Sequence, residues 1–297
     1  VRTGDHILIT DSAYDPTRSF ANGMLKMMGV ETTYYDPLIG ADIESLFQEN
    51  TKLVFTETPG SLTFEVQDLP AIIAAAKKRD LFVITDNTWA TPLFLNPLAL
   101  GADITVNAAT KYMGGHSDVM MGAATANERT FKKLRRTAYQ LGQTVSADDA
   151  FLVLRGLRTL GVRLKQHEEN ALKVAAWLQE HPAVGRVLHP AFEECPGHEI
   201  WARDFAGSTG LFSIVLKAGA YDDTAHLVDG MKLFKMGFSW GGYESLILPS
   251  DPSGARTATT WQSDGPVIRL HIGLEDTDDL IADLDAGLMR YMSHLGL

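Results

Sequence analysis

The sequence has a single cysteine, Cys195, among its 297 residues, so it can form no disulfide within itself. One cysteine fits a reducing compartment, and we expect a cytoplasmic protein. Paired with His198, it also falls short of a structural zinc set, so no metal is expected. The sequence contains no apolar run of the roughly 18 residues that span a membrane, and neither a Gly-x-Gly-x-x-Gly motif after a strand nor a Walker loop.

Positive charge is also scarce, with 26 Lys and Arg against 37 Asp and Glu and a net charge of −11. A nucleic-acid-binding surface would show as clustered Lys and Arg. The one dense basic run, residues 132–136, is more typical of the solvated face of a helix. We therefore expect neither a nucleic-acid nor a membrane partner.

What the sequence does contain is ordinary globular composition, 45% apolar and 9% aromatic, with length enough for about two domains. Short apolar runs, apolar on both faces, alternate with helical segments in the first part of the chain. This pattern predicts a largely parallel sheet covered on two sides. The expected strands are residues 6–10, 52–56, 81–85 and 104–106, and the clearest helix is 69–80.

Helical periodicity dominates from Ala147 to about Glu180, interrupted by Gly156 and Gly161. After it, strands are expected at residues 210–217, 233–240 and 267–273, followed by a last helix that starts near residue 276. The pattern predicts a large domain over 1–154, a connecting helix over 155–180, and a smaller α+β domain over 181–297.

Two polar side chains directly follow apolar strands, where an open α/β sheet displays its ligand-binding groups. Asp86 follows the strand 81–85, and its simpler interpretation is a cap of the next turn. Lys111 follows the strand 104–106 and precedes Gly114-Gly115, which lets backbone approach a ligand closely. A lone lysine at a strand end is usually a surface residue, so neither position is decisive by itself.

Taken together, Asp86 and Lys111 indicate a site for pyridoxal phosphate. This cofactor needs a lysine for its Schiff base and an acidic partner that keeps its pyridine nitrogen protonated. Small apolar neighbours disfavour the ammonium form of a lysine and make its amine available as a nucleophile. Tyr14, after the first strand, can stack on a planar ligand or belong to the core.

The segment Gly237-Phe238-Ser239-Trp240-Gly241 supplies a rival interpretation, because it matches the Gly-x-Ser-x-Gly elbow of serine hydrolases. His271 lies downstream with Asp251 and Asp264 between, which is the chain order of that fold. An elbow leads into a long helix, but residues 243–249 are apolar and end at a proline. The sequence therefore favours the pyridoxal site.

Five longer motifs occur in order between Gly4 and the C-terminus. They are Thr-Asp-Asn-Thr-Trp (85–89), Ala-Ala-Thr-Lys-Tyr with Gly-His-Ser-Asp (108–118), Arg-Gly-Leu-Arg-Thr-Leu (155–160), Ser-Trp-Gly-Gly-Tyr-Glu-Ser (239–245) and Ile-Arg-Leu-His-Ile-Gly-Leu-Glu (268–275). In this order they resemble the Cys/Met-metabolism family of pyridoxal-phosphate enzymes, and within it the bacterial cystathionine β-lyases most closely.

The resemblance implies an α/β, fold-type-I, aspartate-aminotransferase-like architecture and a role for each matching residue. Lys111 would hold the cofactor covalently and shuttle the substrate Cα proton, while Asp86 would pair with the pyridine nitrogen. Tyr14 would stack on the cofactor ring, and Thr110 would hydrogen-bond its phosphate. Arg269 would clamp the substrate α-carboxylate with a two-point fork. The remaining implied pocket residues are Ser239, Trp240 and Tyr139.

The implied activity is cleavage of L-cystathionine to homocysteine, pyruvate and ammonia, a carbon–sulfur β-lyase reaction of methionine biosynthesis. Two features favour β- over γ-cleavage: Trp240 after Ser239, and Thr58-Pro59-Gly60-Ser61 where γ-branch relatives carry Ser-Pro-Thr-Asn-Pro. The alternatives are a cystathionine γ-lyase or γ-synthase and a broader cysteine-S-conjugate lyase. Outside this class, a serine hydrolase and a binding module without catalysis stay open.

The resemblance also implies a homotetramer whose active sites are shared between subunits. Ala108 stands where many relatives carry a serine that binds phosphate. The N-terminal arm and phosphate loop of the family would precede Val1, so the architecture is expected to be N-terminally incomplete. With Thr110 as one of few phosphate donors, we expect this chain alone to bind the cofactor weakly and to assemble poorly.

Overall fold

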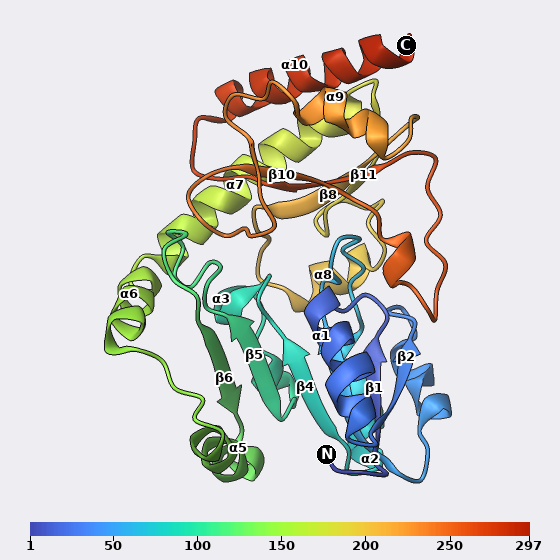
Figure 1. Ribbon diagram of the computed structural model, residues 1–297, viewed down its shortest axis with the longest axis vertical. Coiled ribbons are helices and arrows are strands. Elements are labelled where there is room, and N and C mark those ends of the chain that lie inside the picture. Colours follow the sequence, from blue (N-terminus) through green and yellow to red (C-terminus); the bar gives the residue numbers. More distant parts are fainter.

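The structure, a computed structural model, describes residues 1–297. The N-terminal part forms a six-stranded sheet and the C-terminal part a five-stranded sheet, which lie in the lower and upper halves of Figure 1. None of the helices combines the length and the apolar character needed to cross a membrane.

The first sheet has the strand order β2-β1-β3-β4-β5-β6, and all neighbours are parallel except β5 and β6. The prediction of a largely parallel sheet is therefore confirmed. Because the parallel strands end at the same edge, the residues after β3, β4 and β5 meet there. The strands are β1 (His6–Thr10), β2 (Glu31–Tyr35), β3 (Thr51–Glu57), β4 (Phe82–Asp86), β5 (Ile104–Ala108) and β6 (Gly122–Ala126).

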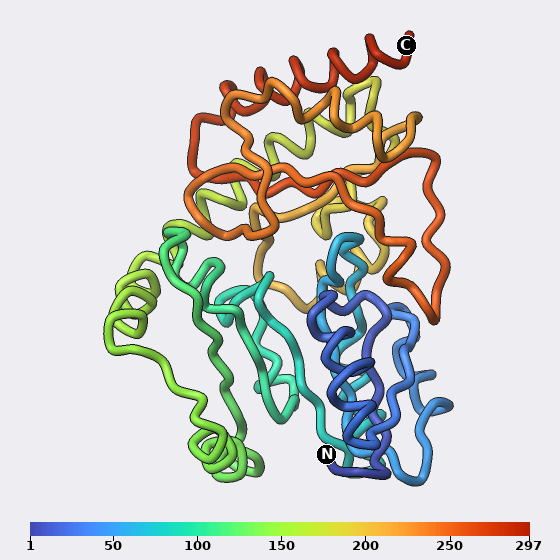
Figure 2. Tube along the Cα trace, viewed as in Figure 1, coloured from blue at the N-terminus to red at the C-terminus, as the bar shows by residue number.

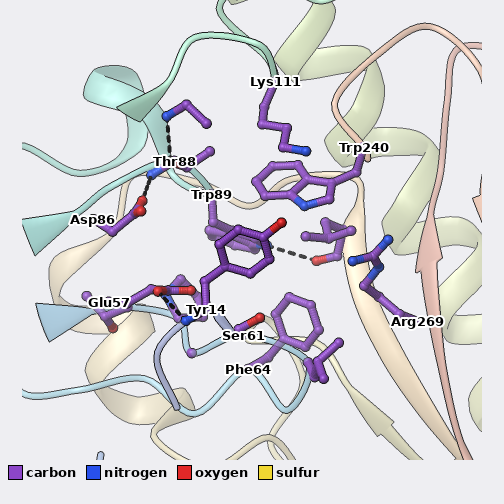
Figure 3. Close-up of a pocket in the computed structure, with 16 residues that line it drawn as sticks. Tyr14, Glu57, Ser61, Phe64, Asp86, Thr88, Trp89, Lys111, Trp240 and Arg269 are labelled. Carbon is purple, nitrogen blue, oxygen red and sulfur yellow. Dashed lines mark hydrogen bonds between the residues drawn. The ribbon is translucent and has the colours of Figure 1, made fainter. Parts of the chain in front are cut away.

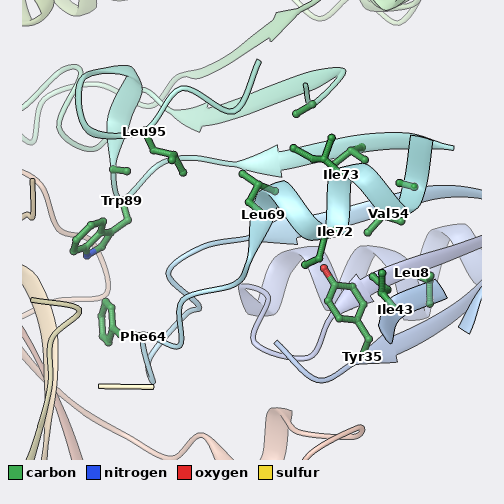
Figure 4. Close-up of a cluster of buried hydrophobic side chains, with 14 of the residues drawn as sticks. Leu8, Tyr35, Ile43, Val54, Phe64, Leu69, Ile72, Ile73, Trp89 and Leu95 are labelled. Carbon is green, nitrogen blue, oxygen red and sulfur yellow. The ribbon is translucent and has the colours of Figure 1, made fainter. Parts of the chain in front are cut away.

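Helices cover both faces of this sheet. Successive side chains of β1 point to opposite faces, and apolar residues on both faces need cover. Leu8 faces the side of α2, where it joins Val54 and Ile72 in a buried cluster (Figure 4). Ile7 and Ile9 face the other side, where residues after β1 pack on them. The helices and helical turns here are α1 (Asp15–Phe20), η1 (Ala21–Leu25), η2 (Gly40–Leu46), α2 (Leu69–Lys78), α3 (Thr91–Phe94), α4 (Pro97–Leu100) and α5 (Glu128–Gln140).

Two helices, α6 (Ala147–Leu157) and α7 (Leu160–Glu180), connect the sheets. The predicted helix over 155–180 therefore begins too early, because residues 155–157 still belong to α6. The break lies at Thr159 rather than at the glycines, and Arg163 bridges it with bonds to the Thr159 hydroxyl and the Gly156 carbonyl. A side chain at Gly156 would collide with the backbone of residues 113–114, so this glycine lets α6 pack on the turn after Lys111.

The second sheet has the order β7-β8-β11-β10-β9 and is antiparallel except between β9 and β10. The strand predicted over 233–240 is wrong for most of its length, since only residues 235–236 pair. The helices α7 and α10 share one buried cluster with this sheet. The elements are β7 (Val184–Leu188), α8 (His198–Asp204), β8 (Leu211–Leu216), η3 (Asp222–Thr224), α9 (Ala225–Val228), β9 (Lys235–Met236), β10 (Leu246–Ser250), η4 (Ser253–Ala255), β11 (Val267–His271) and α10 (Thr277–Leu295).

The loop between β10 and β11 is hydrogen-bonded to the buried carboxylate of Asp11, which follows β1 of the first sheet. Figure 2 shows the segment between β10 and β11 reaching from the upper sheet toward the top of the lower one. The backbone N–H groups of Thr257, Ala258 and Thr259 donate to Asp11 at 2.9–3.0 Å, as do both threonine hydroxyls. Arg18 completes the arrangement with an ion pair of 3.0 Å. This contact holds the two sheets together beside the pocket described next.

Candidate active site

A pocket lies at the carboxyl ends of β3, β4 and β5, where the first sheet faces the second (Figure 3). This is the edge at which open α/β sheets bind ligands. Both sheets contribute side chains, so the pocket depends on their relative placement. Its charged and aromatic lining residues include Tyr14, Glu57, Asp86, Lys111, Trp240 and Arg269.

Lys111 projects into the pocket from the turn that follows β5. Its Nζ donates a hydrogen bond of 2.8 Å to the Ser239 hydroxyl and lies 5.2 Å from the centre of the Trp240 ring. Burial and, second, the positive charge of Arg269 lower the pKa of Lys111 from 10.5 to about 8. A lysine with this pKa has a substantial uncharged fraction near neutral pH, so its amine can act as nucleophile or base.

Asp86 is the last residue of β4 and lines the same pocket. Its carboxylate accepts the Thr88 N–H at 2.8 Å, and the Thr88 hydroxyl in turn accepts the N–H of Ala108 at the end of β5. Burial raises the pKa of Asp86 although Thr88 opposes the shift. A half-buried carboxylate without a cation is costly, so this site favours a ligand that brings a positive or N–H group.

Arg269 enters the pocket from β11, in the middle of the second sheet. It is 7% exposed, and its Nη2 donates to the carbonyls of Gly237 and Phe238 at 3.1 and 3.0 Å. It forms no ion pair, and burial lowers its pKa from 12.5 to about 10. A buried guanidinium that meets only neutral carbonyls retains the capacity to bind a carboxylate.

The loop that carries Ser239 and Trp240 is held against the backbone of Lys111. Gly241 has φ of +84°, and a Cβ there would lie 2.8 Å from the Tyr112 nitrogen, so glycine is required for this approach. The Gly241 N–H also meets Nε2 of His271 at 3.1 Å. This packing places the Ser239 hydroxyl next to the Lys111 amine.

The same geometry removes the serine-hydrolase interpretation. Ser239 lies in a loop between β9 and β10 with no helix after it. Its hydroxyl contacts Lys111, whereas the Nε2 atom of His271 is engaged by the backbone of residues 241–242. Asp251 caps the Ser253 turn instead of meeting His271. Ser239 therefore has neither the histidine nor the aspartate partner of a Ser-His-Asp triad.

Three residues that the resemblance implies for the site do not line this pocket, although one of them, Ser239, contacts the Lys111 amine. The Thr110 hydroxyl is engaged by the backbone of Met121, accepting its N–H at 2.9 Å. Tyr139 is 64% exposed on α5, where its hydroxyl accepts a bond from Arg135. Their roles in binding phosphate and substrate stay predictions.

Sequence reasoning assigned no individual role to the pocket residues Glu57 and Trp89. Glu57 ends β3 and accepts the backbone N–H of Tyr14 at 2.8 Å. Its signal, a carboxylate directly after an apolar strand, is the same as that of Asp86. Trp89 is buried, and its indole donates to the Leu211 carbonyl of the second sheet at 2.8 Å. That contact crosses between sheets and leaves no local pattern in the sequence.

Comparison with known proteins gives a consistent set of similarities. The model of the Cys/Met metabolism PLP-dependent enzyme family matches residues 1–289. The cystathionine β-lyase of Escherichia coli (strain K12) is 52% identical over 98% of this chain and 75% of that protein. The cystathionine β-lyase of Salmonella typhimurium (strain LT2) is 49% identical with the same coverage. The solved cystathionine γ-synthase of Xanthomonas oryzae pv. oryzae, in complex with aminoacrylate and cysteine, is 36% identical with a TM-score of 0.91, covering 99% of this chain and 77% of that one.

Proposed function

The chain belongs to the Cys/Met-metabolism family of pyridoxal-phosphate-dependent enzymes, and we propose that it is a carbon–sulfur β-lyase that cleaves L-cystathionine to homocysteine, pyruvate and ammonia. Its fold is that of the fold-type-I enzymes of this class. Identity of 52% and 49% to β-lyases, against 36% to a γ-synthase, favours β-cleavage. The observation that carries the proposal is one pocket that gathers the amine of Lys111, the carboxylate of Asp86 and the unpaired guanidinium of Arg269.

The donor set of the pocket fits pyridoxal phosphate. Lys111 supplies an amine with a lowered pKa for the covalent bond to the cofactor. The half-buried carboxylate of Asp86 supplies the partner that keeps a pyridine nitrogen protonated. Tyr14, 48% exposed at the pocket wall, offers a ring on which the cofactor can stack. We propose that these residues hold the cofactor, with Thr110 near its phosphate.

When bound, the cofactor supplies an electron sink for the charge left by loss of the substrate Cα proton. We propose that Lys111 accepts this proton, because its amine is partly uncharged near neutral pH. Ser239 fixes the direction of the amine through the bond at 2.8 Å. Arg269 would bind the substrate α-carboxylate and thereby fix the orientation of the substrate about its Cα. Trp240 covers the amine and limits access of water.

The products of cystathionine identify the bond that breaks. The purified chain, saturated with pyridoxal phosphate, is expected to yield pyruvate and homocysteine in equal amounts. Chromatography of the keto acids after derivatisation separates pyruvate from 2-oxobutyrate. If the products are chiefly 2-oxobutyrate and cysteine, the enzyme catalyses γ-cleavage. If a fluorophosphonate labels Ser239 and cystathionine stays intact, the serine-hydrolase interpretation is correct.

The Arg269→Lys variant tests the carboxylate clamp. Lysine keeps the charge but cannot reproduce a two-point fork. Loss of one charge-assisted hydrogen bond, about 1.5–3 kcal/mol, is expected to lower kcat/KM roughly ten- to a hundred-fold. Steady-state kinetics with cystathionine measure the effect, with Arg186→Lys on β7 as the control for a partly exposed arginine. An unchanged kcat/KM would remove this role from Arg269.

We further propose that the protein functions as a cytoplasmic homotetramer with shared active sites. Exposed apolar side chains on neighbouring helices support an interface: Phe151, Leu154 and Leu157 on α6 and Val162 on α7. The proposed role of Tyr139, which lies outside the pocket of its own chain, depends on such an assembly. The cytoplasmic location rests on the single cysteine.

A further inference from the structure

We infer that Glu57 is a positioning residue of the site, which fixes the backbone of Tyr14 at the pocket wall while acting as the uncharged partner of Asp86. The inference deepens the proposed function, because Tyr14 is one of the residues proposed to hold the cofactor. The two claims can fail separately, since the position of Tyr14 and the charge of Glu57 can be measured without substrate.

The positions of the two carboxyl groups follow from the sheet register. Glu57 and Asp86 are the last residues of β3 and β4, and they are direct partners across these parallel strands. Both side chains line the pocket. Two carboxyl groups brought together at one partly buried edge cannot both carry a charge cheaply, so one of them is expected to keep its proton.

The carbonyl of Tyr14 is held by α1, where it accepts the N–H groups of Thr17 and Arg18 at 2.9 and 3.3 Å, so the bond to its own N–H is what connects it to the first sheet. Tyr14 is the residue before α1, and its side chain makes no capping bond to that helix. Its N–H points away from the helix to Oε2 of Glu57 at 2.8 Å (Figure 3). This bond ties the start of α1 to the end of β3, and it needs only an acceptor oxygen. A protonated carboxyl group or an amide supplies that oxygen as well as a carboxylate does.

The charged groups around Glu57 agree with a neutral carboxyl. Burial and, next, the carboxylate of Asp86 raise the pKa of Glu57 well above its usual value. The Tyr14 N–H and the Arg256 guanidinium act in the opposite direction without cancelling the shift. Arg256 is itself engaged by Glu65. The negative charge of the pair then stays on Asp86, where a pyridine nitrogen would need it.

A raised pKa in the folded state has a defined effect on stability. The proton-linked contribution of Glu57 is fully present below the unfolded pKa of about 4.3 and is lost as pH rises toward the folded value. Glu57 therefore costs the fold progressively more as pH increases. A Glu57→Gln variant removes this cost and keeps the acceptor for Tyr14.

Three variants of the full 297-residue chain separate the two roles: Glu57→Gln, Glu57→Ala, and Glu49→Gln as the control. Glu49 is exposed and makes no side-chain hydrogen bond, so it reports the same chemical change on the surface. Hydrogen exchange with mass spectrometry follows the peptide that contains the Tyr14 amide, without cofactor. Thermal unfolding is followed from about pH 5 to about pH 8, and kcat/KM for cystathionine is measured with saturating cofactor.

We expect the thermal unfolding midpoint of Glu57→Gln to exceed that of wild type at about pH 8. The two midpoints should converge toward about pH 5. Exchange at Tyr14 should match wild type in this variant and rise about tenfold in Glu57→Ala, the factor for loss of one hydrogen bond of about 1.4 kcal/mol. The Ala variant should lose kcat/KM by a similar factor, and Gln should restore it. Glu49→Gln should match wild type throughout.

Two results would overturn the inference. If Glu57→Gln lowers the midpoint at about pH 8 or abolishes turnover as Glu57→Ala does, Glu57 acts as a carboxylate. If Tyr14 exchanges at the wild-type rate in Glu57→Ala, the bond does not position it. If instead these measurements behave as expected while wild type fails to cleave cystathionine, the positioning role stands and the proposed function falls.

Discussion

Replacing Lys111 with alanine is expected to abolish cleavage of cystathionine, with turnover reduced at least about a thousandfold. The amine is proposed both to bond the cofactor and to accept the Cα proton, and positioned proton transfer alone contributes about 10²–10⁴. No other lysine lines the pocket, so none can replace Lys111. The Lys111 amine is also held by the Ser239 hydroxyl and has a pKa of about 8. Pyruvate release from cystathionine measures the loss.

The matched control for this variant is Lys132→Ala, which removes a lysine from the exposed face of α5. It should keep wild-type turnover. The Lys111→Ala chain should also lose the visible absorbance that the wild-type chain shows with excess cofactor. Retention of more than about a tenth of the turnover by Lys111→Ala would exclude this residue as the proton acceptor.

The second large effect is expected at Asp11, whose carboxylate binds the loop between β10 and β11 to the first sheet. An Asp11→Asn variant leaves the buried guanidinium of Arg18 without its counter-charge and turns an NH₂ group toward backbone N–H donors. Removing one partner of a buried pair typically costs about 3–5 kcal/mol, so the free energy of unfolding should fall by about that amount. Denaturant unfolding of the two chains gives the difference.

Asp264→Asn is the control, because Asp264 lies in the same loop, is exposed and makes no side-chain hydrogen bond. The pH dependence adds a second check. Burial would raise the pKa of Asp11, but the hydrogen bonds from Thr257 and Thr259 outweigh it and lower the pKa. Its stabilisation is therefore present above the unfolded pKa of about 3.9 and is lost as pH falls below it. If the free energy of unfolding of Asp11→Asn equals that of wild type near neutral pH, this contact does not hold the sheets together.

The parts of the fold that the sequence predicted are those with strong local patterns. Apolar runs at residues 6–10, 81–85 and 104–106 became strands of the first sheet, where the first is buried throughout and the other two alternate between buried and half-buried residues. The edge strands β2 and β6 were not predicted. Their residues, Glu-Thr-Thr-Tyr-Tyr and Gly-Ala-Ala-Thr-Ala, are half polar or small, since an edge strand is covered less completely.

The error over residues 233–240 has a different origin. The segment is apolar enough for a strand, but Phe238 is 80% exposed and the backbone after Met236 leaves the sheet. It turns instead onto the backbone of Lys111 through Gly241. An apolar loop that faces a pocket or a subunit interface has the composition of a strand, so local pattern cannot separate the two.

Within the site, the residues found from sequence are those at strand ends or in the family motifs. Asp86 and Lys111 follow strands, so their common edge was predictable. Arg269 was implied by a motif alone, and its role as a buried guanidinium without an acid became visible only in three dimensions. Contacts between sheets, such as Asp11 with the 257–259 backbone, join residues far apart in sequence and leave no periodic signal.

Borohydride reduction of the wild-type chain saturated with pyridoxal phosphate, followed by peptide mass mapping, locates the lysine that carries the cofactor. We predict that the label lies on the peptide that contains Lys111, and that excess cystathionine added before reduction lowers its yield. A stoichiometric label on an exposed lysine, with Lys111 unmodified, would contradict the assignment of this pocket as the active site.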